Sequence, residues 1–150
     1  MPVTMNQVLA EIDKDEPNYA AAAKLGRDAL PHLRMIAEAE DPLRASKAAY
    51  LASLIGGPDS VELLKKAAEH HDPQVRLAVA HGLRNADAAA PNDLLERLLG
   101  DHDAGVRKMA VSTVGDLGRS ALKAKVAGIA ANDPEEFLRA AAVKATTKLK

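Results

Sequence analysis

The chain has 150 residues, no cysteine, 2% aromatic residues and a formal net charge of −1 at pH 7. The absence of cysteine excludes disulfides, a thiolate nucleophile and thiolate metal ligands, and the near-zero charge argues against a dedicated nucleic-acid binder, which needs a basic excess. This length fits one domain over residues 1–150, and the alanine-rich composition favours helices over strands.

Ten helices are expected, arranged as five pairs with no linker between them. Thr4 and Gln7 form a capping box at the first helix, and the first pair is shorter than the others, as terminal repeats tend to be. The expected helices cover residues 4–14, 17–26, 28–39, 42–55, 60–70, 73–84, 91–100, 104–117, 120–131 and 134–149.

Three apolar columns recur along the first helix of each pair with a spacing of 31 residues. Within one helix the three positions are i, i+3 and i+4, which is the stripe of an amphipathic helix. A constant spacing of this length is typical of stacked helical repeats. The columns are Leu33, Leu64, Leu95 and Val126; Ile36, Ala67, Leu98 and Ile129; and Ala37, Ala68, Leu99 and Ala130.

Each second helix is expected to begin at an aspartate, often followed by proline. Aspartate is a strong N-cap, and proline fits the first helical position because its missing N–H would have had no partner there. The predicted caps are Asp41, Asp72, Asp103 and, one residue out of step, Asp133. The core stripe of these helices is expected to open at Leu43, Val75, Val106 and Leu138.

The segments Asp72–Arg76 and Asp103–Arg107 resemble the D-P-x-V-R pattern that opens the second helix of HEAT repeats, in the subtype named after phycobilisome lyases. Leu30-Pro31 resembles the bend of the preceding helix, and the resemblance covers nearly the whole chain. It implies an all-α fold, a right-handed α-solenoid (superhelix) of about five HEAT-like helix pairs, with the second helices on the concave side.

Four arginines recur every 31 or 32 residues just inside the second helices, namely Arg44, Arg76, Arg107 and Arg139. The resemblance implies that they form an inter-repeat ladder with aspartates such as Asp72 and Asp103. The alternative is a row of phosphate or carboxylate ligands, since the planar guanidinium can bond two acceptors at once.

The histidines near the turns do not predict a metal site. His71 and His102 lie one repeat apart, and stacked helices are separated by about 8–10 Å, too far for parallel side chains to share an ion easily. We therefore expect solvated turn residues, no metal and no cofactor.

Catalytic motifs are absent from the sequence: there is no glycine-rich phosphate loop and no nucleophile elbow. Other enzymes of this architecture use His-Glu iron ligands or tryptophan, and neither occurs here. Bilin lyases stay open through the subtype resemblance alone, although an alanine-lined surface without cysteine offers little to hold a tetrapyrrole. We expect no enzymatic activity.

The residues of the second helices that point away from the core define the expected binding face. The outward columns are Ala45, Leu77, Lys108 and Ala140; Ala49, His81, Ser112 and Lys144; and Ala52, Arg84, Gly115 and Thr147. We expect binding at Leu77, His81, Arg84, Lys108, Ser112 and Lys144. A flat floor with basic flanks suits an acidic peptide or an acidic, amphipathic helix.

Together these features predict a monomeric, cytoplasmic, non-catalytic scaffold or adaptor that binds a protein or peptide and does not associate with membranes. Two alternatives remain: an accessory or lyase-like subunit acting on a chromophore-bearing protein, and weak binding of a nucleic-acid backbone. The second alternative rests on the C-terminal half, since residues 76–150 carry 12 Lys and Arg against 9 Asp and Glu.

Overall fold

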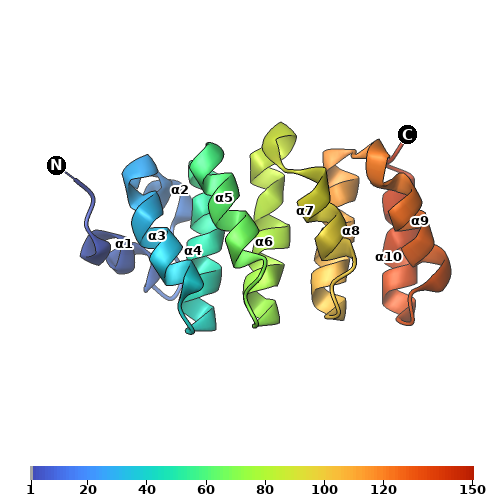
Figure 1. Ribbon diagram of the computed structural model, residues 1–150, viewed down its shortest axis with the longest axis horizontal. Coiled ribbons are helices and arrows are strands. Elements are labelled where there is room, and N and C mark those ends of the chain that lie inside the picture. The colour runs from blue at the N-terminus through green and yellow to red at the C-terminus, as the bar shows by residue number, and fades with distance from the viewer. Residues whose placement is uncertain (1) are drawn as a thin grey trace.

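The computed structural model describes residues 2–150 as an α-solenoid whose helices follow one another along the long axis of the molecule (Figure 1). The α-helices are α1 (Met5–Ile12), α2 (Tyr19–Ala22), α3 (Leu30–Glu38), α4 (Pro42–Ile55), α5 (Pro58–Ala67), α6 (Pro73–Ala86), α7 (Asn92–Leu99), α8 (Ala104–Leu117), α9 (Lys123–Asn132) and α10 (Glu136–Thr146). Short 3-10 turns cover residues 23–25, 27–29, 87–89 and 120–122. This architecture confirms the predicted fold class.

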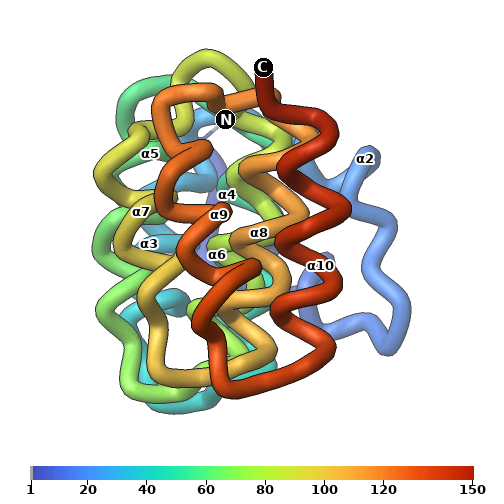
Figure 2. The backbone as a smooth tube through the Cα atoms, turned by 90° about the vertical axis from the view of Figure 1, so that its right-hand side faces the viewer, coloured from blue at the N-terminus to red at the C-terminus, as the bar shows by residue number. Residues whose placement is uncertain are grey.

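The helices form two layers (Figure 2). The first helices α3, α5, α7 and α9 make one layer, and the second helices α4, α6, α8 and α10 make the other. Neighbouring second helices pack extensively on each other, whereas α5 and α7 barely touch. The stack is therefore tighter along the second layer, and we call the solvent-facing side of that layer the inner face.

Aspartates cap the second helices α4, α6 and α8. The carboxylate of Asp41 accepts from the Leu43 N–H at 3.1 Å, and that of Asp72 accepts from the Gln74 N–H at 2.8 Å. At the other end, α8 stops at Gly118, whose φ of 65° lies in the left-handed region that glycine adopts at least cost.

The repeated apolar columns form the core between the two layers. Leu33, Leu64, Leu95 and Val126 are all fully buried. Burying a leucine or valine side chain contributes about 1.5–3 kcal/mol, so each member of this column stabilises the contact between the two layers.

One predicted register is wrong by a single residue, in α4. Leu43 is 54% exposed, whereas Ala45, Ala49 and Ala52, which were expected to face outward, are fully buried. Counted from the caps, Ala45 is the equivalent of Arg76, because each lies four residues after its capping aspartate.

Helices α4 and α6 make the most extensive contact in the molecule, and Gly82 of α6 makes it possible. A Cβ at residue 82 would lie 2.8 Å from Oγ and 2.9 Å from Cβ of Ser53. The two helices therefore approach as closely as the absence of a side chain permits.

Within residues 2–150, no helix combines the length and the apolar character needed to cross a lipid bilayer.

Candidate functional site

Arg76 and Arg107 each join their own repeat to the one that follows. Arg76 donates from Nε and Nη2 to the carboxylate of Asp101 at 2.8 and 3.1 Å, and Arg107 donates in the same way to Asp133 at 3.0 and 3.2 Å. Each Nη1 donates to two backbone carbonyls of its own repeat, His70 and His71 for Arg76. These bonds occupy the guanidinium groups, so neither arginine is free to hold a ligand.

The acidic partners differ from the predicted ones. Asp72 and Asp103 are N-caps, and the carboxylates of the ladder are Asp101 and Asp133. Asp133 is not a cap, because Glu135 occupies that position. Asp101 and Asp133 each lie two residues before the N-cap of the second helix in their repeat. An alignment of the repeats on these N-caps would have shown an aspartate at this position twice in the sequence.

Arg44 and Arg139 depart from this pattern. Arg44 lies three residues after its cap instead of four, and it bonds backward to Asp13 of the first pair at 2.9 and 2.8 Å. Arg139 donates from Nη1 to the Asp133 carbonyl at 2.7 Å. The contact between the α4 and α6 repeats therefore lacks an arginine-aspartate rung.

Acid should weaken the ladder. Burial alone would raise the pKa of Asp133, but the Glu135 N–H and the guanidinium of Arg107 outweigh burial and hold this pKa below the ordinary 3.8. A lowered folded-state pKa stabilises the fold above the unfolded-state value, and that stabilisation is lost as the pH falls through the folded-state value. We expect urea midpoints to fall below about pH 4, and to fall less in Asp133→Asn, whose midpoint at pH 7 is already lower.

The columns of the inner face differ from the predicted ones in α4. Residues at the same distance from the N-caps of α4, α6, α8 and α10 form three columns: Ser46, Leu77, Lys108 and Ala140; Tyr50, His81, Ser112 and Lys144; and Ser53, Arg84, Gly115 and Thr147. The six residues expected to bind lie on this face, but its N-terminal part carries Tyr50 where alanine was expected.

Aromatic rings line the N-terminal part of the inner face. Tyr19 from α2 meets Tyr50 edge-on, with ring centroids 4.9 Å apart, and Tyr50 stacks on His81 at 5.0 Å. The segment carrying α2 lies beyond the second layer (Figure 2), which brings Tyr19 beside this face. Burial and, to a smaller extent, Arg84 lower the pKa of His81 below 6.5, so the imidazole is neutral at pH 7.

A basic pocket of about 190 Å³ lies at the C-terminal part of the same face, between α8 and α10. Its floor is Gly115, where a Cβ would lie 3.2 Å from Cβ of Ala145. Around this floor stand Ser112 and the three lysines Lys108, Lys144 and Lys148. We call these residues the basic pocket.

Two polar side chains of the basic pocket are fixed by neighbouring charged residues. Arg84 donates from Nη2 to Ser112 Oγ at 2.7 Å, which leaves the hydroxyl proton available to a ligand. Lys148 bonds Asp116 at 2.8 Å, and this bond, with Arg84 nearby, lowers the pKa of Asp116. Lys144 has no salt-bridge partner within residues 2–150, so the pocket retains positive charge suited to an oxyanion.

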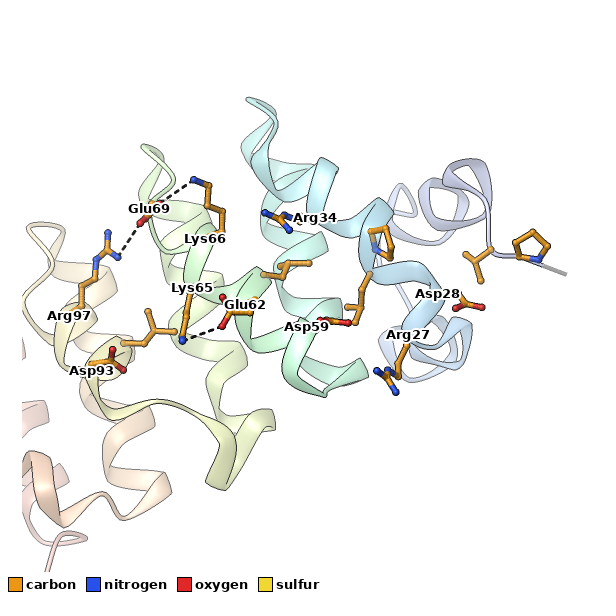
Figure 3. Close-up of a pocket in the computed structure, with 16 residues that line it drawn as sticks. Arg27, Asp28, Arg34, Asp59, Glu62, Lys65, Lys66, Glu69, Asp93 and Arg97 are labelled. Atoms are coloured by element: carbon orange, nitrogen blue, oxygen red, sulfur yellow. Dashed lines mark hydrogen bonds and ion pairs between the residues drawn. The ribbon is translucent and has the colours of Figure 1, made fainter.

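A larger groove of about 1340 Å³ crosses the first helices on the opposite side (Figure 3). Its lining carries five basic and five acidic residues. Several of them neutralise one another: Lys65 with Glu62 at 3.3 Å, and Glu69 with Lys66 at 3.5 Å and Arg97 at 3.8 Å. This groove has no net charge with which to select a ligand.

The turn histidines have structural contacts. His70 accepts the Asp72 N–H on Nδ1 at 3.1 Å and lies 2.9 Å from the Ala39 carbonyl through Nε2. It occupies the position of Asp101 in its own repeat. Across residues 2–150, no three histidine, aspartate or glutamate side chains converge as a metal site would require.

Stacked antiparallel helix pairs joined by arginine-aspartate rungs define an α-solenoid repeat protein. The chain belongs to the HEAT repeat family, whose sequence pattern matches residues 61–146. No curated protein sequence matches it.

A solved structure with a similar fold is the complex of CpcE and CpcF of phycocyanin lyase from Nostoc sp. PCC7120. The TM-score is 0.75 at 21% sequence identity, with 94% of this chain and 96% of that chain covered. This finding contradicts the expectation of a chain without an enzymatic role, because the same fold serves as a component of a lyase. A solenoid without a catalytic motif is therefore no ground for excluding an enzyme subunit.

Proposed function

We propose that this chain is a lyase-like or accessory subunit that works with a protein partner on a chromophore-bearing protein, and that its inner face holds a tetrapyrrole. The observation that carries the proposal is the presence, on one face, of a row of rings and a basic pocket. The resemblance in fold to a component of phycocyanin lyase supports the same reading.

The ring row suits the conjugated part of a tetrapyrrole. Tyr19, Tyr50 and neutral His81 form a continuous aromatic edge on which a flat π-system can stack. The expected alanine lining at α4 is not present, because Ala45, Ala49 and Ala52 are buried and Tyr50 lies on this face instead.

The basic pocket suits the carboxylates of such a molecule. Lys108 and Lys144 supply charge, and Ser112 supplies a hydroxyl donor. One column runs from Tyr50 through His81 and Ser112 to Lys144, so it passes from apolar rings to a cation. A ligand lying along it would meet stacking groups at one end and acid-binding groups at the other.

Acidic protein segments are a second class of ligand for the same face. Leu77 is partly exposed and next to Lys108 in its column, so an acidic amphipathic helix could use both. The chromophore proposal makes the narrower prediction, because only it requires the ring row.

Titration with biliverdin, a tetrapyrrole dicarboxylate, tests the proposal through visible absorbance. We expect saturable binding, and we expect the double variant Lys108→Glu and Lys144→Glu to raise Kd by about tenfold or more, since charge-assisted bonds are lost. Its unfolding free energy should change by no more than about 0.5 kcal/mol, because both lysines are exposed.

The matched control reverses Lys123 and Lys125 on α9, which are also exposed but lie outside the basic pocket. Equal weakening by both double variants would indicate non-specific charge attraction and would refute the proposed site. Absence of biliverdin binding, with steeply salt-dependent binding of DNA instead, would favour the nucleic-acid alternative.

A further inference from the structure

Arg84 connects the two parts of the inner face, although it does not itself line the basic pocket. It lies on α6 three residues after His81 of the ring row, so the two side chains share one face of that helix. Its guanidinium reaches across to α8, where Nη2 donates to Ser112 Oγ at 2.7 Å and Nε lies 3.1 Å from Oδ2 of Asp116. One side chain therefore joins the helix of the ring row to the helix that carries the pocket.

The contact with Arg84 determines how Ser112 can interact with a ligand. A serine hydroxyl has one proton to donate and two lone pairs that accept. One lone pair of Ser112 accepts from Arg84, and the hydroxyl proton has no acceptor within residues 2–150. A hydrogen bond from a cation also polarises the hydroxyl and so strengthens its own donation. Ser112 therefore offers the pocket a strengthened donor, which favours an oxyanion as its acceptor.

Asp116 decides which cations of the pocket remain available. Its carboxylate is shared between Arg84 and Lys148, whose Nζ lies 2.8 Å from Oδ1 of Asp116. The charge of Lys148 is therefore offset at its own position. The pocket donors without a carboxylate partner in the described part of the chain are Lys108, Ser112 and Lys144.

Arg84 also acts on the ring row. Burial lowers the pKa of His81, and the charge of Arg84 lowers it further. The neighbours of His81 in its column, Tyr50 on α4 and Ser112 on α8, are uncharged near neutral pH, so Arg84 is the charged group that acts on it. An oxyanion at Ser112 would offset the charge of Arg84, and the pKa of His81 should then rise. By linkage, protonation of His81 strengthens oxyanion binding by the same factor.

We infer that Arg84 is a positioning residue: it leaves the Ser112 proton for an oxyanion in the basic pocket, and it carries the effect of that oxyanion to His81. The sequence predicted direct binding by Arg84, whereas the contacts make it act through Ser112. The inference deepens the proposed function and rests on the same pocket. In that function the oxyanion is a carboxylate of the chromophore, and inorganic phosphate offers the same chemistry.

An NMR titration of His81 with and without inorganic phosphate tests this link without a chromophore. In the parent chain we expect phosphate to raise the pKa of His81. In Arg84→Ala this pKa should already be raised without phosphate, and phosphate should bind about tenfold more weakly. The matched control, Arg34→Ala, removes the same charge from an exposed position on α3 and should change neither quantity.

Arg84→Lys separates the charge of this residue from its geometry. Lysine keeps the positive charge, but its single ammonium lacks the planar fork that reaches Ser112 and Asp116 together. We expect the pKa of His81 to stay low in this variant, while phosphate binding weakens about tenfold, as in Arg84→Ala. Full recovery of phosphate binding by lysine would reduce the role of Arg84 to charge alone and overturn the inference.

A double-mutant cycle with Ser112→Ala completes the test. Because Arg84 acts through Ser112, the two alanine substitutions together should weaken phosphate binding by less than the product of their separate effects. Effects that multiply, or a pKa of His81 that phosphate leaves unchanged in the parent chain, would overturn the inference. Repeating the cycle with biliverdin distinguishes the two proposals. A link to phosphate without biliverdin binding would refute the chromophore proposal alone, and biliverdin binding that ignores both Arg84 variants would refute the role of Arg84 alone.

Discussion

Arg76→Ala is expected to lower the free energy of unfolding by about 3–5 kcal/mol, the range for breaking a buried ion pair by removing one partner. The side chains of Arg76 and Asp101 are 7% and 8% exposed. Without the guanidinium, Asp101 would stay buried without its countercharge, and the His70 and His71 carbonyls would lose a donor. Urea denaturation at pH 7 measures the effect.

The control is Arg44→Ala, which removes the same type of bidentate pair from the surface. Arg44 and Asp13 are 47% and 40% exposed, so water screens their attraction, and we expect a much smaller loss of stability than in Arg76→Ala. Similar losses in the two variants would show that burial does not govern the strength of these arginine-aspartate pairs.

Gly82→Ala is expected to destabilise the protein by about 1–3 kcal/mol, although alanine is the better helix former. The added methyl would overlap both Cβ and Oγ of Ser53, and Cβ cannot move aside without its backbone. Helices α4 and α6 would have to separate. The change in melting temperature and in urea midpoint would report the cost.

The same substitution at Gly128 should have the opposite sign. Gly128 lies within α9, and a Cβ there would meet no atom within 4 Å. Alanine should therefore stabilise the helix by about 0.5–1 kcal/mol through its lower conformational entropy in the unfolded chain. If both variants lose stability equally, helix spacing is not the cause of the effect at Gly82.

The elements with clear end signals were predictable from the sequence. Helices α4 and α8 begin and end at the predicted residues, because aspartate caps fix their starts and glycines end them. The helix expected over residues 17–26 is mostly absent, since only Tyr19–Ala22 is α-helical and Gly26 has a φ of 76°. A 3-10 turn over Ala23–Leu25 follows α2 directly, so the high helix propensity of alanine did not carry the α-helix on to Gly26.

The C-terminal part of the candidate site was predicted from the sequence, but its N-terminal part was not. The prediction treated Arg44 as the equivalent of Arg76, which shifted the register of α4 by one residue and placed Tyr50 in the core and Ala49 on the surface. The spacing of Tyr50, His81 and Ser112 by 31 residues would have revealed the true column. The rungs to Asp101 and Asp133 could not be derived in this way, because they depend on how far one repeat is shifted against the next.

Because no arginine-aspartate rung links α4 and α6, the repeats of the solenoid are held together by two kinds of contact. The contact between α4 and α6 at Gly82 depends on the close approach of two helices, whereas the contacts on the C-terminal side of α6 also contain buried ion pairs whose carboxylates become protonated in acid. Acid should therefore act unequally on the contacts along the solenoid. We expect the contacts from α6 to α10 to loosen before the contact between α4 and α6.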